Sequence, residues 1–156
     1  LGDVYKRQTY INNGIHLSKS DEKIEKKISL DLSNNPDLAQ TIVVTCLGLG
    51  IDCDLYGLQT LKIKETDRLE ALKSEIEKFG VDKIEITDNS LHLENKAQLK
   101  SHISIDTYND HRMAMSFAPL SLLNPIIIND PMVVTKSYVS FWDHLKKLGF
   151  EISKNK

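Results

Sequence analysis

The sequence ISLD at residues 28–31 returns as ISID at residues 103–106, 75 residues further along the chain. Apolar and polar side chains alternate in both copies, which is typical of a strand with one buried face. The same offset relates Ala39 to Ala114, which lie in the apolar segments that follow the two copies. A repeat of this period indicates that one structural unit occurs twice in the chain.

A hairpin signal precedes each copy of the repeated strand. The pair Asn-Gly at residues 13–14 and the pair Asp-Asn at residues 88–89 stand between short β-type segments. Both pairs favour tight turns between antiparallel strands. The arm after each turn reads apolar-His-Leu, at residues 15–17 and at residues 91–93. We therefore expect each unit to begin with a hairpin.

Helical and extended segments alternate after each copy. In residues 67–79 the apolar side chains recur at helical spacing, and Gly80 follows as a C-terminal cap. The expected elements are helix 38–49, strand 51–56 and helix 67–79 in the first unit, and helix 111–123, strand 126–128 and helix 138–148 in the second. Strand–helix–strand steps imply parallel pairing, whereas hairpins add antiparallel strands, so the sheets should be mixed. The sequence predicts an α/β (mixed α+β) fold.

Composition and charge restrict the classes of partner. The chain has 156 residues, 40% of them hydrophobic and 27% charged, as in a soluble globular protein with one ordinary core. The net charge of -2 argues against a broad nucleic-acid surface, and no apolar run approaches the ~20 residues of a membrane span. Cys46 and Cys53 lie in apolar surroundings without metal-ligand spacing. This predicts buried free thiols in a reducing cytoplasm and no metal site.

Residues 1–8 stand apart from this pattern. There is no initiator Met, and VYKRQ at residues 4–8 resembles the translation of a sequencing adaptor. We expect residues 1–8 to be a non-native leader, residues 9–156 to form the protein domain, and the natural protein to continue upstream.

Two polar strings mark the beginnings of expected helices: KETDR at residues 64–68 and YNDHRMAM at residues 108–115. Each string places a cation, Arg68 or Arg112, in the first helical turn, and Lys136 precedes a third helix. A helix N-terminus carries about half a positive charge, so a cation there costs about 0.3–1 kcal/mol. An anion bound over the helix ends would offset this repulsion. The pattern therefore predicts a site for phosphate or carboxylate groups.

The same residues also have structural interpretations. Asn35 or Asp37 can cap the helix that follows them, or Asp37 can be a ligand-binding carboxylate at the C-terminal edge of a strand. The first polar string can form surface ion pairs worth under about 1 kcal/mol each, with Thr66 as the helix cap. Asp110 can cap the next helix, and a His at a helix end, such as His111, is more often structural than catalytic.

Residues 61–69 and 107–115 resemble the C-terminal signature of the EPSP synthase family, 3-phosphoshikimate 1-carboxyvinyltransferases. Residues 35–39 resemble the Pro-Asp-Ala segment of that family, and residues 130–136 resemble its terminal Lys region. The resemblance covers nearly everything after Tyr10. It implies a fold of two lobes, each built from βαβαββ units with mixed sheets. This chain would supply two βαβαββ-type repeat units of one lobe.

The resemblance also implies an activity. Members of the family transfer the enolpyruvyl group from phosphoenolpyruvate to the 5-hydroxyl of 3-phosphoshikimate and release phosphate, a step of the shikimate pathway. The family uses neither a metal nor an organic cofactor. The full-length protein is expected to be a cytoplasmic monomer whose partners are these two substrates, with no nucleic acid and no membrane.

The matched positions have roles in this reaction. By resemblance, Asp37 is the base at the 5-hydroxyl and Glu65 is the acid that protonates the methylene carbon of phosphoenolpyruvate. Lys64 contacts phosphoshikimate and assists its deprotonation. The cations that hold phosphoenolpyruvate are Arg68, Arg112 and Lys136, and the supporting residues are Thr60, Asp110 and His111. Thr60 is a departure, because many members have at this position an Asn that touches the shikimate part.

The resemblance reaches only the final part, well under half, of a family member. The groups for the shikimate phosphate and the lobe that closes over the site are expected outside this chain. Because catalysis needs closure to exclude water and align both substrates, we expect the chain alone to be nearly inactive. Two alternatives stay open. One is UDP-N-acetylglucosamine enolpyruvyl transferase, which shares the fold but matches residues 108–115 poorly, and the other is a non-catalytic anion-binding or interaction domain.

Overall fold

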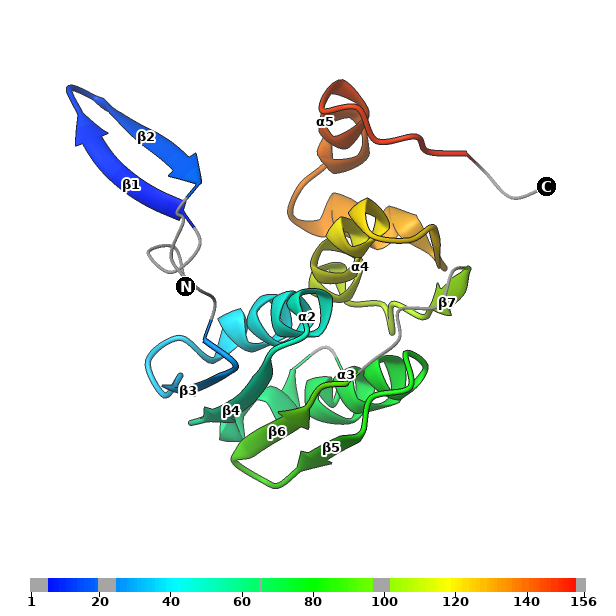
Figure 1. Ribbon diagram of the computed structural model, residues 1–156. Coiled ribbons are helices and arrows are strands. Elements are labelled where there is room, and N and C mark those ends of the chain that lie inside the picture. Colours follow the sequence, from blue (N-terminus) through cyan, green and yellow to red (C-terminus); the bar gives the residue numbers. More distant parts are fainter. Residues whose placement is uncertain (1–5, 20–24, 65, 97–101, 154–156) are drawn as a thin grey trace.

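The computed structural model describes residues 6–19, 25–64, 66–96 and 102–153 (Figure 1). Of the expected leader, residues 1–5 lie outside the described residues, and residues 6–8 belong to the first strand. Among the described residues, no helix is long and apolar enough to cross a membrane.

Strands and helices alternate in the predicted order. The strands are β1 (Lys6–Ile11), β2 (Gly14–Lys19), β3 (Lys27–Asp31), β4 (Asp52–Tyr56), β5 (Lys83–Ile86), β6 (Ser90–Glu94), β7 (Ile103–Ile105) and β8 (Ile126–Ile128). The α-helices are α2 (Ala39–Leu49), α3 (Arg68–Glu77), α4 (His111–Phe117) and α5 (Phe141–Lys147). Short 3-10 helices are η1 (Pro36–Leu38), η2 (Gln59–Ile63), η3 (Ala118–Leu122) and η4 (Pro131–Lys136).

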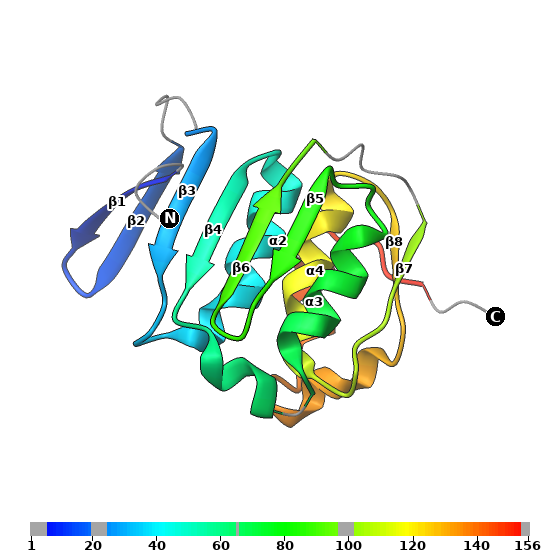
Figure 2. The ribbon, with the colours of Figure 1, turned by 90° about the horizontal axis from the view of Figure 1, so that it is seen from below.

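The central sheet is mixed and has the strand order β3-β4-β6-β5 (Figure 2). β3 and β4 are parallel, and β6 runs antiparallel to both β4 and β5. Along the chain this part reads β3-α2-β4-α3-β5-β6, which is a complete βαβαββ succession. The hairpin β1–β2 precedes it, and the parallel pair β7–β8 follows it. The predicted α/β class with mixed pairing is confirmed.

The first hairpin turn lies one residue earlier than predicted. Gly14 is paired with Ile11, so the loop consists of Asn12 and Asn13. Asn12 has the left-handed conformation, with φ 50°. An Asn side chain tolerates this conformation better than most residues, which is why the loop needs no glycine.

The helix predicted over residues 111–123 is shorter than expected. α4 ends at Phe117, and residues 118–122 continue as the 3-10 helix η3. The cause is Pro119, which has no N–H to donate and whose ring clashes with the carbonyl four residues earlier. The last helix also begins later than predicted, at Phe141.

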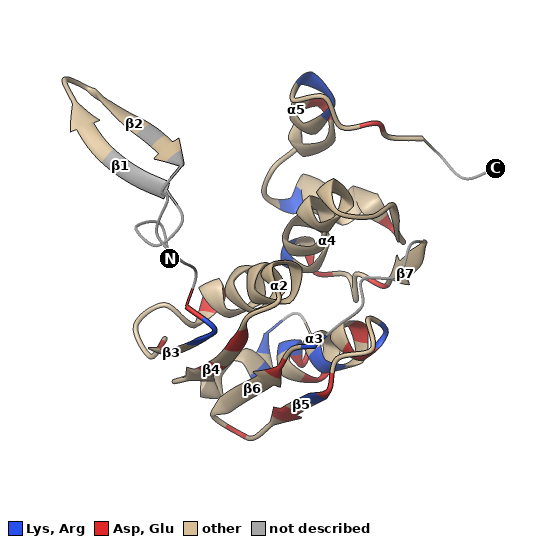
Figure 3. Ribbon diagram, in the orientation of Figure 1, with Lys and Arg blue, Asp and Glu red and all other residues tan. Residues whose placement is uncertain are grey.

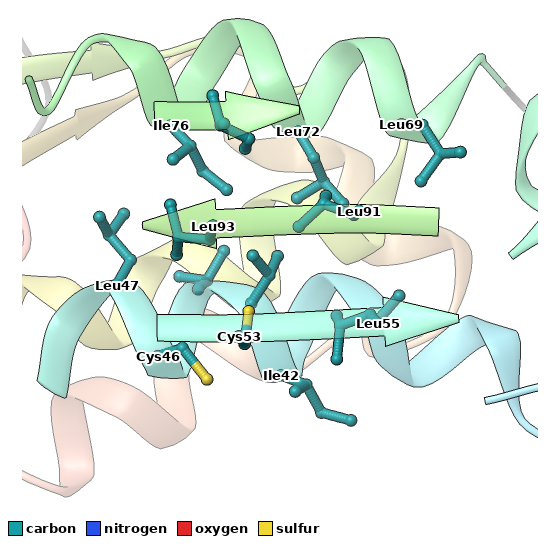
Figure 4. Packing of buried hydrophobic residues seen from close by; sticks show 14 of the residues in the cluster. Ile42, Cys46, Leu47, Cys53, Leu55, Leu69, Leu72, Ile76, Leu91 and Leu93 are labelled. Carbon is teal, nitrogen blue, oxygen red and sulfur yellow. The ribbon is translucent and has the colours of Figure 1, made fainter. Parts of the chain in front are cut away.

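The hydrophobic core lies between the central sheet and helices α2, α3 and α4. Figure 4 shows the stripe of α3, formed by Leu69, Leu72 and Ile76, beside Leu91 and Leu93 of β6. All five side chains are buried. The apolar periodicity that predicted this helix therefore marks the face that packs on the sheet.

The two cysteines belong to this core, one on α2 and one on β4 (Figure 4). Cys46 and Cys53 are free and 0% exposed, so the prediction of buried thiols is confirmed. A hydrogen bond with Cys46, together with burial, raises the pKa of the Cys53 thiol. Because both side chains are 0% exposed, neither thiol is open to reagents from solvent in the folded chain.

Candidate active site

The candidate residues gather at the edge where the parallel strands β3 and β4 end. Figure 2 shows η2, the starts of α3 and α4, and the orange segment η4 at this edge. Asp37 lies in η1 shortly after β3, and Lys64 directly follows η2. Arg68 is the first residue of α3, and Arg112 is the second residue of α4. This edge is where open α/β sheets bind ligands.

The carboxylate of Asp37 is the meeting point of three cations. Arg68 Nη1 donates to Oδ1 at 2.8 Å, and Lys64 Nζ lies 3.6 Å from the same oxygen. Arg112 Nη2 donates to Oδ2 at 3.1 Å, and its Nη1 donates to the backbone carbonyl of Asp37 at 3.3 Å. Figure 3 marks the basic residues at the beginnings of α3 and α4 that contribute to this cluster. The four side chains come from four different segments.

Asp37 therefore does not act as a helix cap. Within the described residues, no side-chain cap bond is made by Asn35, which precedes η1, or at Leu38, which precedes α2. The cap interpretation of Asn35 and Asp37 is wrong. The physical reason is that cations from distant segments attract the carboxylate more strongly than a neutral backbone N–H does.

The cap of α3 is Asp67, and the prediction of Thr66 is wrong. The Oδ1 atom of Asp67 accepts the backbone N–H groups of Leu69 and Glu70 at 3.1 and 3.2 Å. A carboxylate at this position is favoured over a hydroxyl because it also balances the positive helix end. It thereby offsets part of the repulsion that the helix end exerts on Arg68.

Behind Asp37, Arg68 makes a buried ion pair with Asp110. Arg68 Nε and Asp110 Oδ2 are 2.6 Å apart, and the two side chains are 2% and 0% exposed. Asp110 Oδ1 accepts the backbone N–H of Arg112 at 2.8 Å, so Asp110 caps α4 as predicted. The carboxylate of Asp110 thus positions both arginines. It binds the side chain of Arg68 and the backbone N–H of Arg112.

The charges of this cluster do not cancel. Among the described residues, three cations, Lys64, Arg68 and Arg112, face two carboxylates, Asp37 and Asp110. Partial burial raises the pKa of Asp37, but the charges of Arg112, Lys64 and Arg68 outweigh it and hold the pKa below its usual value. Asp37 is ionised at neutral pH, and the described side chains of the cluster still have an excess of positive charge. Such an excess of positive charge at the carboxyl ends of the strands attracts anions.

Lys136 contacts the loop that precedes α4. Its Nζ donates to the backbone carbonyl and to Oδ1 of Asn109, both at 2.7 Å. Tyr108 and Asn109 both have left-handed backbone conformations, with φ 52° and 57°. The structure therefore brings Lys136 to the loop that leads into Asp110, whereas Arg68 and Arg112 share Asp37 directly.

The remaining candidates occupy varied positions. Nδ1 of His111 is buried and, within the described residues, has no hydrogen-bond partner, and the same holds for Nε of Arg112. Thr60 is exposed in η2. Glu65 lies outside the described residues. The described residues contain no group of three or more His, Cys, Asp or Glu side chains that could hold a metal ion.

Two buried polar residues of this region were missed by the sequence analysis. Gln40 is 1% exposed and donates to Asp110 Oδ2 at 3.2 Å. Glu75 is 0% exposed and accepts the hydroxyl of Tyr108 at 2.8 Å and the backbone N–H of Asp106 at 3.1 Å. Burial and the hydrogen bond to Glu75 raise the pKa of Tyr108 to about 12. The available signal was a polar residue within an apolar helical face, which is rarely buried without a partner.

Comparison with known proteins identifies the family of this chain. A sequence model of the family described as EPSP synthase (3-phosphoshikimate 1-carboxyvinyltransferase) matches residues 9–145. A protein of Bacteroides fragilis named 3-phosphoshikimate 1-carboxyvinyltransferase is 46% identical over 145 residues, which cover 92% of this chain and 35% of the relative. A Neisseria meningitidis protein of the same name is 34% identical over 137 residues, with 87% and 31% covered. The chain thus spans about a third of the length of these curated relatives.

Solved structures show the same fold. An EPSP synthase structure from Acinetobacter baumannii matches with a TM-score of 0.73 at 21% identity, covering 96% of this chain and 37% of that chain. A second structure of EPSP synthase from Acinetobacter baumannii matches with a TM-score of 0.67. Because the family match extends over most of the sequence, this chain belongs to the EPSP synthase (3-phosphoshikimate 1-carboxyvinyltransferase) family.

Proposed function

We propose that this chain supplies one side of the active site that transfers the enolpyruvyl group of phosphoenolpyruvate to the 5-hydroxyl of 3-phosphoshikimate, with release of phosphate. The observation that carries the proposal is the cluster of Lys64, Arg68 and Arg112 around the carboxylate of Asp37. The Asp37 carboxylate pairs with these three cations, and a substrate anion would compete with it for them.

The cations suit the two anionic groups of phosphoenolpyruvate. Arg68 and Arg112 present planar guanidinium forks, which match carboxylate and phosphate oxygens, and Lys136 adds a mobile point charge. The hydrogen bond that Nε of Arg68 donates to Asp110 orients the Nη groups of Arg68 toward Asp37. Such preorganised charge stabilises a transition state in which negative charge moves onto the departing phosphate.

The proton transfers fall to the carboxylates. Asp37 accepts the proton of the 5-hydroxyl as the oxygen attacks the enolpyruvyl carbon, and Lys64 lowers the cost of that deprotonation. Glu65 delivers a proton to the methylene carbon, and as the phosphate leaves the adduct the new methyl group returns a proton to the Glu65 carboxylate, which restores the double bond. As long as the cations hold the pKa of Asp37 low, Asp37 is a weak base. Binding of substrate anions satisfies those cations, so the pKa of Asp37 rises when a base is needed.

A chimaera tests this function. Residues 9–156 replace the corresponding C-terminal part of the Bacteroides fragilis relative, of which this chain matches 35%. We expect the chimaera to release phosphate from phosphoenolpyruvate and 3-phosphoshikimate, and the 156-residue chain alone to release almost none. Two matched variants are made in the chimaera. Arg112→Gln should abolish turnover. Lys62→Gln removes an ion pair with the exposed Asp88 and should leave turnover intact.

The outcomes of this assay distinguish the alternative functions of the chain. Robust turnover by the chain alone would contradict its role as one side of a larger site. Phosphoenolpyruvate binding without turnover in the chimaera would identify a non-catalytic anion-binding domain. Turnover with UDP-N-acetylglucosamine in place of 3-phosphoshikimate would assign the chain to the other enolpyruvyl transfer.

A further inference from the structure

The segment that leads from β7 to α4, residues 104–110, runs along α3 (Figure 2). Near the end of the helix, Glu75 Oε2 accepts the backbone N–H of Asp106 at 3.1 Å. At the start of the helix, Arg68 Nε donates to Asp110 Oδ2 at 2.6 Å. Glu75 and Arg68 are about two helical turns apart, so both side chains lie on the same face of α3. The helix therefore holds this segment at both ends.

Between these two contacts, the backbone makes a left-handed turn. The φ angle is 52° at Tyr108 and 57° at Asn109. An Asn tolerates this conformation, whereas a bulky residue such as Tyr adopts it only where its surroundings enforce it. The hydroxyl of Tyr108 donates to Oε1 of Glu75 at 2.8 Å, and the Glu75 side chain is 0% exposed. The buried carboxylate thus anchors the side chain of the strained residue.

The turn places the oxygens that direct three cations. The carbonyl and Oδ1 of Asn109 accept Lys136 Nζ, both at 2.7 Å. The next residue, Asp110, binds the side chain of Arg68 and the backbone N–H of Arg112. These are the three cations proposed to bind phosphoenolpyruvate. A turn that relaxed to right-handed backbone would move the Asn109 oxygens and the Asp110 carboxylate together.

We propose that Glu75 is a positioning residue for phosphoenolpyruvate, a role that rests on the transfer reaction proposed above. Its carboxylate fixes the turn at Tyr108 and Asn109, and the turn fixes the oxygens that direct the cations. Glu75 acts on the substrate through Tyr108 and does not touch it. Loss of the contact weakens binding of phosphoenolpyruvate more than that of 3-phosphoshikimate, which Lys64 and Asp37 contact.

Steady-state kinetics of the chimaera test this role with Tyr108→Phe, Glu75→Met and the double variant. Tyr108→Phe removes only the hydroxyl, and Glu75→Met keeps the length of the side chain but removes both accepting oxygens. Each should raise the KM for phosphoenolpyruvate by about fivefold or more, and change the KM for 3-phosphoshikimate by less than about twofold. Because both variants remove the same contact, the double variant should raise the KM no further than the larger single effect.

The matched control is Ile84→Val, which removes a buried methyl group from β5, away from the segment 104–110. Such a variant loses stability through its packing alone. A smaller folded fraction lowers the apparent kcat, so Ile84→Val should leave both KM values unchanged. Far-UV circular dichroism checks that every variant folds.

NMR of the 156-residue chain tests the turn without catalysis. Backbone chemical shifts and HN–Hα couplings report φ at residues 108 and 109. We expect positive φ at both in the wild type and in Ile84→Val, and its loss in Tyr108→Phe and Glu75→Met.

Three results would each overturn the proposal: an unchanged turn in Tyr108→Phe and Glu75→Met, KM values for the two substrates that stay constant or rise together, and effects that multiply in the double variant. An inactive wild-type chimaera would instead reject the proposed function. The NMR comparison would then still decide whether Glu75 holds the turn.

Discussion

Arg68 and Asp110 form an ion pair that is closed to solvent on both sides, with Nε and Oδ2 2.6 Å apart and side chains 2% and 0% exposed. The pair joins the start of α3 to the start of α4, and therefore connects the first unit of the repeat to the second. A charge buried in this way is stable only with its partner in place, because removal of one partner leaves the other desolvated and unpaired.

Replacement of Asp110 by Asn keeps an acceptor for the α4 cap but removes the charge opposite Arg68. We expect the free energy of unfolding to fall by about 3 kcal/mol, the lower part of the range for a broken buried pair, because Arg68 keeps its bond to Asp37. Urea denaturation measures the loss. The control is Asp88→Asn, which breaks a surface pair with Lys62 and should cost under about 1 kcal/mol. Equal losses in the two variants would contradict the prediction.

The carboxyl pKa of Asp37 should report anion binding. In the chain without ligand the cations lower this pKa, so the carboxylate contributes stability above its unfolded pKa of about 3.9 and loses it as the pH falls through the lower folded value. Phosphoenolpyruvate adds negative charge beside Asp37, so saturation should raise the pKa. A carbon-detected NMR titration follows it. Asp31, whose pKa is lowered by hydrogen bonds from Ser33, should not respond, and an unchanged Asp37 would argue against a shared site.

Asp37 and Glu65 should affect turnover more than binding. In the active chimaera, Asp37→Ala and Glu65→Ala should each lower kcat by about 10²–10⁴-fold with a smaller change in KM, because a positioned acid or base acts only in the transition state. Steady-state phosphate release gives both constants. Glu70→Ala, in the first turn of α3 and exposed, is the matched control and should leave kcat unchanged. Near-normal turnover of either variant would remove that residue from its role.

Gly57 should tolerate no side chain. Its φ is 77°, and a Cβ there would clash with the backbone nitrogen of Ser33, in the loop that leads to Asp37. Gly57→Ala should therefore lower the free energy of unfolding by about 2 kcal/mol or more, from left-handed strain plus the displaced loop. Gly50→Ala, at φ 68° with nothing within 4 Å, isolates the strain and should cost about 1 kcal/mol. Thermal or urea unfolding of the two variants compares them, and equal losses would show that the contact with Ser33 is immaterial.

Much of the fold followed from short-range patterns. The repeat at residues 28–31 and 103–106 predicted the alternation of strands and helices, and the stripe from Leu69 to Phe79 predicted the buried face of α3. These signals act within a few residues, so they survive without knowledge of the rest of the fold. The end of α4 at Phe117 was missed although Pro119 marks it, because the apolar spacing continues across the break.

The sequence by itself determined which elements form, which faces they bury and which charged residues stand at helix starts, because periodicity, turn residues and caps are local properties. Only the tertiary structure decided that Asp37 meets Arg68 and Arg112, from which it is separated by 31 and 75 residues, rather than capping its own helix. It also decided that Arg68 is buried against Asp110. The physical reason is that a charged side chain pairs with the groups that folding brings within reach. A carboxylate binds a cation from a distant segment more strongly than the neutral N–H groups of its own helix.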